Sequence, residues 1–308
     1  MPAEPSAAAL SNPLLRYFLA TRPAFLSVTF TACLVGLATA AADGVALNPV
    51  TSLVTVLFAL VAHAGINVLN DYYDATADGT NVERIYPFTG GSRFIQNGVL
   101  TQRQTRLFGL ALLAAVVPAG LALAAQAGAG LVAIGASGLF IGWAYSAPPL
   151  ALASRGLGEA AVAAGWLLVV LGTDYVQRGA LAPTPLAAGL SQALLVAAVL
   201  FINQFPDRRA DEAAGKRTLV VRLGPRAARW GYPVIAGGAY GWLGLQLVLN
   251  HLPGAATLAL VPLPLSAWAA AELARHAARP AHLAGAIRTT IAAALLHGLL
   301  LAGALAFA

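Results

Sequence analysis

Nine apolar runs recur along the chain, and each is about 20 residues long, enough to cross the hydrocarbon core of a bilayer as a helix. Of the 308 residues, 59% are hydrophobic and only 10% are charged, whereas soluble domains carry about 25% charged residues. We therefore expect an all-α polytopic membrane protein with nine transmembrane helices, in a single domain that covers 1–308. The predicted spans are 24–43, 49–69, 105–125, 127–146, 157–176, 184–205, 230–250, 254–273 and 285–307.

The basic residues are distributed unevenly between the two sides of the predicted bundle. Of the 18 Lys and Arg, 17 fall at the N-terminus or in loops after even-numbered spans, and only Arg178 falls on the other side. By the positive-inside rule the N-terminus is cytoplasmic. An excess of Arg over Lys, with abundant Ala and Gly, indicates a bacterial genome, so the predicted location is the bacterial cytoplasmic membrane. Cys33 is alone, which excludes a disulfide framework, and residues 1–12 are expected to form a disordered tail.

Two short acidic segments each come at the end of an apolar run. Seven of the twelve acids lie in or just after these segments. Carboxylates at membrane depth are costly, and such clusters usually mark a functional site. The first segment contains Asn67, Asn70, Asp71, Asp74 and Asp78, and the second contains Asn203, Asp207 and Asp211.

The spacing within both segments matches the period of an α-helix. Positions 67, 71, 74 and 78 advance by 4, 3 and 4 residues, and positions 203, 207 and 211 advance by 4. Each set is therefore expected to share one helix face. Unpaired carboxylates on one face would repel one another, so cations are expected beside them. Hard oxygen ligands suit Mg²⁺, and Mg²⁺ suits a diphosphate.

Basic residues follow each acidic segment. Lys216 and Arg217 come directly after the second segment, where they would hold phosphate oxygens. An ordinary positive-inside loop is the alternative interpretation of these two residues. After the first segment, a Gly90-Gly91 pair lies between Arg84 and Arg93, which indicates a flexible lid that carries two more cations.

Aromatic residues and one histidine lie close to the acidic segments in the sequence. The rings of Tyr72 and Tyr145 could stabilise a developing cation, or could belong to an interfacial belt. His63 lies one helical turn before Asn67 and is either a contact for an aromatic substrate or a structural residue. No feature of the sequence indicates a nucleic-acid partner, and the oligomeric state is left open.

These motifs resemble the UbiA superfamily of intramembrane prenyltransferases, and the resemblance covers almost the whole chain. Two aspartate motifs in order, the second with a Gly-Lys-x-Thr tail, are highly specific for that superfamily. The resemblance implies nine transmembrane helices around a central cavity, in agreement with the spans predicted above. The matching pieces are Asn70-Asp71-x-x-Asp74-x-x-x-Asp78, Tyr145-Ser-x-x-Pro148, Arg155-Gly-Leu-Gly158-Glu159 and Asp207-x-x-x-Asp211-x-x-x-Gly215-Lys-Arg-Thr218.

Three further stretches are similar to the branch of the superfamily that prenylates 1,4-dihydroxy-2-naphthoate for menaquinone biosynthesis. They are the Gly90-Gly91 loop, 171–177 and 215–224. Asp174 departs from that pattern, because an uncharged and often aromatic residue is expected there. Asn203, at the first position of the second motif, is another departure.

The resemblance implies Mg²⁺-dependent transfer of a polyprenyl group from polyprenyl diphosphate to an aromatic acceptor within the lipid bilayer, at a site open to the cytoplasm. The implied metal ligands are Asp71, Asp74, Asp78, Asp207 and Asp211, of which Asp71, Asp74, Asp207 and Asp211 are also the implied catalytic residues. The implied substrate-binding residues are Asn67, Asn70, Tyr72, Arg84, Arg93, Tyr145, Arg155, Asn203, Lys216 and Arg217.

The identity of the acceptor stays open at this point. The alternative to the naphthoate is 4-hydroxybenzoate, and homogentisate, a chlorophyllide and haem are less favoured. A different class of protein is a secondary transporter, with the acids as a cation pathway. Against a transporter, both acidic segments are predicted at one membrane face, whereas transporter sites usually lie near the midplane.

Overall fold

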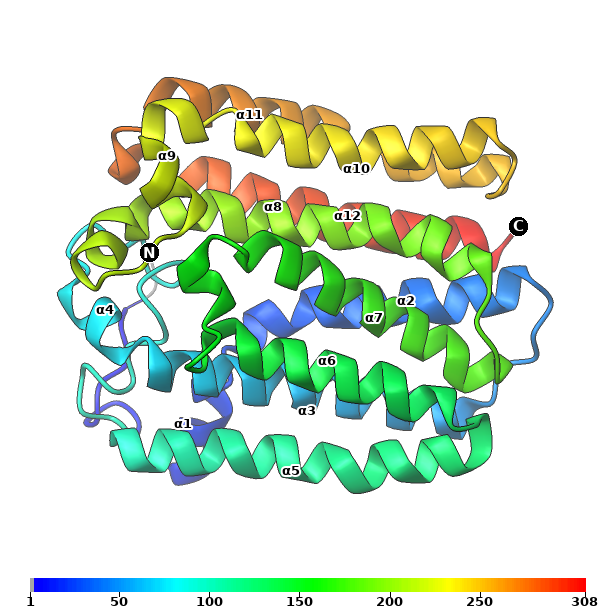
Figure 1. The fold of residues 1–308 in the computed structure, drawn as a ribbon, viewed down its shortest axis with the longest axis horizontal. Coiled ribbons are helices and arrows are strands. Elements are labelled where there is room, and N and C mark those ends of the chain that lie inside the picture. The colour runs from blue at the N-terminus through cyan, green and yellow to red at the C-terminus, as the bar shows by residue number, and fades with distance from the viewer. Residues whose placement is uncertain (1–2) are drawn as a thin grey trace.

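The computed structural model describes residues 3–308, which form helices and loops without a strand. The long helices lie side by side along one direction, with the two ends of the chain at opposite ends of the bundle (Figure 1). The α-helices are α1 (Pro13–Ala20), α2 (Pro23–Ala42), α3 (Pro49–Tyr73), α4 (Ala75–Thr80), α5 (Gln102–Ala127), α6 (Gly130–Ser146), α7 (Gly158–Arg178), α8 (Pro183–Ala213), α9 (Leu219–Ala228), α10 (Gly231–Val248), α11 (Leu263–His276) and α12 (Ala284–Ala306). The short 3₁₀ helices are η1 (Leu152–Arg155), η2 (Gly254–Leu260) and η3 (Pro280–His282).

The predicted all-helical membrane fold is confirmed. Each of the nine predicted spans overlaps a long helix, with η2 and α11 together covering 254–273. Seven helical segments of the described chain are long and apolar enough to cross a bilayer: Pro23–Ala42, Pro49–Tyr73, Gln102–Ala127, Gly158–Arg178, Pro183–Ala213, Gly254–His276 and Ala284–Ala306. The count of nine transmembrane helices, which requires α6 and α10 to cross as well, and the orientation of the N-terminus stay predictions.

Helix α8 lies at the centre of the bundle. Within its most apolar stretch 78% of the residues are buried, the largest share among the seven segments. Helices α10 and α11 pack on one side of α8 and α12, and α2 and α7 pack on the other (Figure 1). Beyond α2 and α7 come α3 and α6, and α5 lies against α3. Because α8 is longer than its predicted span, its last turns extend past Phe205 and carry the second acidic segment.

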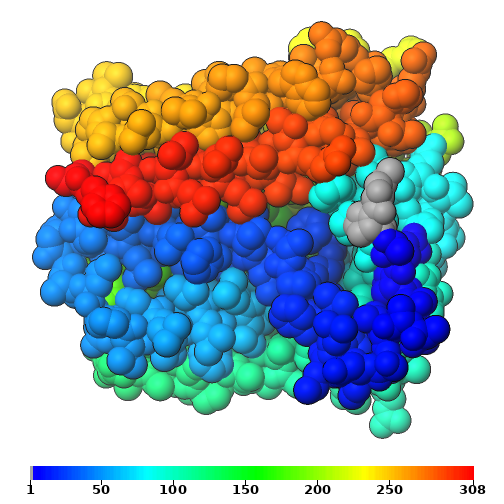
Figure 2. Space-filling model, turned by 180° about the vertical axis from the view of Figure 1, so that it is seen from behind, coloured from blue at the N-terminus to red at the C-terminus, as the bar shows by residue number. Residues whose placement is uncertain are grey.

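The end of the bundle that carries both acidic segments, called the acidic end below, is covered by two pieces of non-membrane chain. One is the loop 81–101 after α4, and the other is the N-terminal segment, described from residue 3, which was predicted to belong to a disordered tail. Figure 2 shows this segment and α1 in dark blue against the cyan residues of the loop. Leu10 of the segment is buried in a small apolar cluster with Ala20, Phe94, Val99 and Leu100.

A charged network ties three helices together at the opposite end of the bundle. The carboxylate of Asp174 on α7 is only 1% exposed and accepts hydrogen bonds from Arg178 Nε at 2.8 Å and Arg178 Nη2 at 2.9 Å. The Thr39 hydroxyl of α2 donates to the same carboxylate at 3.0 Å. Arg178 also pairs with Asp43 at 2.7 Å, and Thr184 at the start of α8 donates to Asp43 at 3.0 Å. Asp174, which departs from the family pattern, is therefore part of a network that joins α2, α7 and α8 at the end of the bundle away from the acidic end.

Candidate active site

A cavity of about 1070 Å³ extends from the acidic end into the bundle between α2, α3, α5, α6, α7 and α8. Most of its wall is apolar, and its polar residues gather at the acidic end. Nine of the predicted site residues line it: Asn67, Asn70, Asp74, Asp78, Tyr145, Asn203, Asp207, Asp211 and Lys216. The cavity therefore brings residues of both acidic segments to one place.

The first acidic segment spans the junction between two helices. Helix α3 ends at Tyr73 and α4 begins at Ala75, so Asp74 lies at the junction between two helices. Asp74 and Asp78 line the cavity, whereas Asp71 is 5% exposed and accepts a hydrogen bond from the Ser92 backbone N–H at 3.0 Å. The helix that the spacing predicted is therefore interrupted at Asp74, and a loop N–H engages Asp71.

The second acidic segment keeps the regular spacing that the sequence predicted. Asn203, Asp207 and Asp211 all lie on α8, one turn apart, and all three line the cavity. Asp207 accepts a hydrogen bond from the Asn81 amide, which follows α4. The Asn203 Oδ1 atom is buried and has no hydrogen-bonding partner within residues 3–308. This acceptor can therefore bind a donor or a cation in the cavity.

Lys216 connects the two acidic segments. Its ammonium lies 2.9 Å from Asp74 Oδ1 and 3.3 Å from Asp211 Oδ1. The chain returns to the acids because α8 ends in a Schellman turn, in which Gly215 N donates to Glu212 O and Lys216 N to Asp211 O. Gly215 has a φ of +77°, a conformation that glycine adopts without steric cost. Burial opposes the charged form, but the carboxylates of Asp74 and Asp211 raise the pKa of Lys216 above its usual value.

The donor set of the site fits Mg²⁺. Burial raises the pKa of Asp78 to about 8, and the nearby carboxylates of Asp74 and Asp71 add to the rise. A divalent cation bound among these carboxylates would relieve that repulsion. Carboxylate and amide oxygens are the ligands that Mg²⁺ takes in proteins. In the described chain, however, no three acidic, histidine or cysteine side chains are close enough to hold a metal as they stand, so the carboxylates must turn inward to share one.

Gly91 brings the loop 81–101 against the acids. Its φ is +72°, and a Cβ atom there would collide with the Asp78 carboxylate and lie 3.2 Å from Asp71 Oδ1. We expect Gly91→Ala to push these carboxylates aside and to lower turnover about 10²-fold, since a displacement of about 1 Å has that effect in active sites. Gly98→Ala is the matched control, because Gly98 has a φ of +67° and nothing within 4 Å of its added Cβ.

The two glycine variants are compared by steady-state turnover and by thermal unfolding. Both lose about 1–2 kcal/mol of stability to the left-handed backbone conformation. Only Gly91→Ala should lose activity. Equal turnover in the two variants would mean that the position of the Asp78 carboxylate has no effect on the reaction.

Four of the predicted cationic residues lie outside the cavity wall. Glu4 of the N-terminal segment accepts a hydrogen bond from Arg84 Nε at 2.7 Å and lies 3.7 Å from Arg93 Nε. The Arg84 guanidinium holds the pKa of Glu4 below its usual value. Arg155 donates to the Pro149 carbonyl at 2.7 Å, and Arg217 is exposed. Their roles in phosphate binding stay predictions.

The two predicted tyrosines, Tyr72 and Tyr145, differ in position. Tyr145 lines the cavity, but Tyr72 does not; its ring packs edge-on against Tyr73 and lies under the Arg106 guanidinium at 5.8 Å. Arg22, which the sequence interpretation missed, lines the cavity, and its guanidinium lies 4.5 Å from the centre of the Phe25 ring. Its only sequence signal is its position directly before the first span, where any positive-inside residue would stand.

A model of the UbiA prenyltransferase family matches residues 29–286. The chain belongs to the UbiA prenyltransferase family. The resemblance inferred from the aspartate motifs is therefore confirmed.

Curated relatives within this family share a name. The 1,4-dihydroxy-2-naphthoate octaprenyltransferase of Escherichia coli is 32% identical over 216 residues, which cover 68% of this chain and 68% of that protein. The enzyme of the same name from Mycobacterium tuberculosis is 31% identical over 261 residues, covering 83% of this chain and 85% of that protein. The similarity to this branch of the family is also confirmed.

Solved structures share the fold. A UbiA homologue from Archaeoglobus fulgidus bound to DMAPP and Mg²⁺ aligns with a TM-score of 0.59 at 16% identity, over 95% of this chain and 99% of that one. The apo structure of a UbiA homologue from Aeropyrum pernix aligns with a TM-score of 0.65 at 15% identity, over 89% and 96% of the two chains. The all-helical architecture is therefore that of the family.

Proposed function

We propose that the protein transfers a polyprenyl group from polyprenyl diphosphate to 1,4-dihydroxy-2-naphthoate, in the bacterial cytoplasmic membrane, with the acidic end toward the cytoplasm. The observation that carries the proposal is that residues of both acidic segments line one cavity, which has an apolar chamber beyond them. Such a cavity suits a substrate with a charged diphosphate head and a long hydrocarbon tail. The names of the curated relatives support the choice of acceptor.

Mg²⁺, when bound by Asp71, Asp74, Asp78, Asp207 and Asp211, would stabilise the negative charge of the leaving diphosphate. The Lys216 ammonium adds a second cation at the same place, 2.9 Å from Asp74. Together these charges favour cleavage of the allylic C–O bond, whose electron pair leaves with the diphosphate.

The remaining steps depend on the chamber beyond the acids. The ring of Tyr145 lines the cavity and can stabilise the allylic cation through its π face. Apolar walls keep water from the cation until a ring carbon of the acceptor attacks it. Loss of a proton or of CO₂ from that carbon then restores aromaticity.

The test is a prenyl-transfer assay on the purified full chain in detergent, with product masses as the readout. A polyprenyl diphosphate is offered with 1,4-dihydroxy-2-naphthoate or with 4-hydroxybenzoate. We expect a prenylated 1,4-dihydroxynaphthalene, whose mass shows that the naphthoate has lost CO₂. Product from the benzoate alone would keep the transfer chemistry and change the acceptor, and no product from either would overturn the proposal.

Removal of the metal is expected to stop the reaction. Excess EDTA should reduce product formation below detection, because the charge of the departing diphosphate then lacks the metal that would stabilise it. Added Mg²⁺ in excess of the chelator should restore turnover. Full activity in EDTA would contradict the assignment of the carboxylates as metal ligands.

A further inference from the structure

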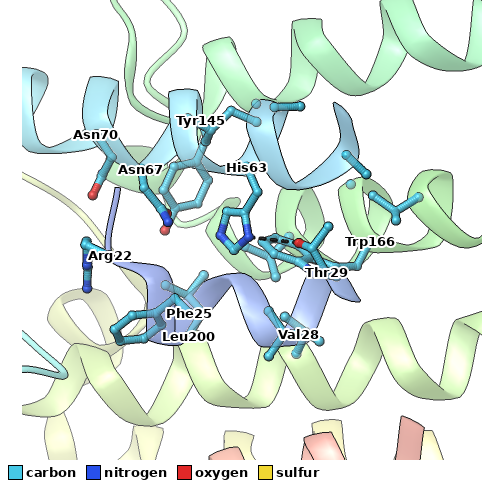
Figure 3. Close-up of a pocket in the computed structure, with 18 of the residues that line it drawn as sticks. Arg22, Phe25, Val28, Thr29, His63, Asn67, Asn70, Tyr145, Trp166 and Leu200 are labelled. Carbon is cyan, nitrogen blue, oxygen red and sulfur yellow. Dashed lines mark hydrogen bonds between the residues drawn. The ribbon is translucent and has the colours of Figure 1, made fainter. Parts of the chain in front are cut away.

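Three polar or aromatic side chains from different helices meet inside the apolar part of the cavity. They are His63 of α3, Thr29 of α2 and Trp166 of α7, and all three line the cavity. Figure 3 shows His63 between Thr29 and Trp166 on one side and Asn67 and Tyr145 on the other. His63 lies two helical turns from Asp71, about 12 Å along α3, so this cluster is deeper in the membrane than the acids.

The His63 ring is fixed in orientation by two contacts. Its Nδ1 atom forms a hydrogen bond with the Thr29 hydroxyl at 2.8 Å. Trp166 packs edge to face against it, with ring centroids 5.0 Å apart and an interplanar angle of 88°. Because both helices hold the ring, the other nitrogen, Nε2, has a defined direction.

The hydrogen bond of the His63 ring to Thr29 is made at Nδ1, so Nε2 is the nitrogen left to face the cavity that the side chain lines. The neighbouring Asn67 side chain, whose amide donates to the Thr21 carbonyl at 3.1 Å, lies close enough to the imidazole to interact with it. His297, another buried histidine, differs in this respect, because Ser191 at 3.0 Å and the Ala259 carbonyl at 2.9 Å satisfy both of its nitrogens.

A ring nitrogen that faces an apolar chamber favours a ligand that brings a hydrogen-bonding group to it, since a ligand without such a group would leave the nitrogen unpaired at a cost of about 1–3 kcal/mol. The hydrocarbon tail of the donor has no such group. An aromatic acceptor with ring hydroxyls does. The position of His63, one turn beyond Asn67 and away from the acids, suits a hydroxyl remote from the reacting carbon.

We propose that His63 Nε2 hydrogen-bonds the ring hydroxyl that lies farthest from the reacting carbon, and so selects a dihydroxylated naphthoate. This inference rests on the proposed function and adds to it a residue that determines the acceptor. Thr29 and Trp166 act as positioning residues, because they orient the imidazole from α2 and α7.

The test compares binding of two ligands that differ by one hydroxyl, 1,4-dihydroxy-2-naphthoate and 1-hydroxy-2-naphthoate. Binding to the full chain is measured by protection against thermal unfolding, which does not depend on turnover. His63→Phe keeps an aromatic ring against Trp166 but removes Nε2. We expect it to weaken binding of the dihydroxy compound about tenfold and to leave binding of the monohydroxy compound unchanged.

His63→Gln is the matched rescue variant, because its side-chain amide can place a hydrogen-bonding group near the position of Nε2. We expect it to restore most of the discrimination between the two naphthoates. In the transfer assay, the KM for polyprenyl diphosphate should be the same in both variants and in the unmodified protein.

Several outcomes would overturn the inference. If His63→Phe weakens binding of the two naphthoates equally, His63 has a purely structural role. If the variant changes only the KM for polyprenyl diphosphate, His63 contacts the hydrocarbon tail of the donor. If the unmodified protein binds neither naphthoate, the inference fails.

A different outcome separates the two proposals. If the unmodified protein binds the naphthoates with the expected discrimination but transfers no prenyl group, the proposed function fails while the His63 contact stands.

Discussion

Replacing Asp207 with alanine should lower prenyl transfer by about 10³-fold or more, and Asp74→Ala should do the same. Each acid belongs to a different segment, and both line the cavity. A metal ion that bridges them would contribute several kcal/mol to the stabilisation of the leaving diphosphate, and each 1.36 kcal/mol corresponds to a factor of ten in rate. Neither change removes apolar contacts from the core, so both variants should fold.

The matched control is Glu272→Ala. Glu272 is an acid on α11, outside the cavity wall, and pairs with Arg275 at 2.6 Å. Turnover is measured with Mg²⁺ and polyprenyl diphosphate, and folding is checked by size-exclusion chromatography and thermal unfolding. The control should retain full activity. If Asp74→Ala and Asp207→Ala both keep turnover within tenfold of the unmodified protein, the two segments are not a shared metal site.

Asp174→Ala should produce the largest loss of stability among the single changes considered, with little effect on chemistry. The substitution removes both hydrogen bonds between Asp174 and Arg178, together with the one from Thr39. Arg178 keeps its pair with Asp43, so the loss comes from these hydrogen bonds, each of which contributes about 1.5–3 kcal/mol because it involves a charged group. We expect the melting midpoint in detergent to fall by about 10 °C.

The comparison variant is Glu212→Ala. Glu212 is paired with Arg208 at 3.1 Å, but its side chain is 59% exposed. Exposed pairs contribute about 0–1 kcal/mol, so its melting midpoint should barely move. Asp174→Ala should still transfer prenyl groups below its melting temperature, because the network lies at the opposite end from the acids. An unchanged melting midpoint would show that Asp174 does not hold α2 and α7 together.

The architecture and the general position of the site could be predicted from the sequence because their signals are local. Apolar runs of membrane length specify helices whatever their neighbours are. The acids at positions 203, 207 and 211 keep helical spacing on one uninterrupted helix. The Gly215-Lys216 pair after that helix has the composition of a Schellman turn. Each of these features depends on residues close together in the chain.

Other features depend on partners that are distant in sequence, and these could not be predicted. Asp71 faces a backbone N–H of Ser92, 21 residues away, so its position in the acidic motif does not place it on the cavity wall. Glu4 engages Arg84 from 80 residues away, although both residues have ordinary surface composition. Asp174 departs from the family pattern, and the reason for a carboxylate at this position is visible only in the structure, where Thr39 and Arg178 lie beside it.

The Lys216 bridge affects how the protein inserts and folds before it binds its substrates. Carboxylates clustered at a membrane boundary would repel one another during insertion if only a metal ion from solution could neutralise them. Here the chain supplies its own counter-ion, 2.9 Å from Asp74 and 3.3 Å from Asp211, so the two acidic segments can assemble without Mg²⁺. Maturation of the fold is thereby uncoupled from the supply of metal, and protein stripped with EDTA should remain folded and ready to be reloaded.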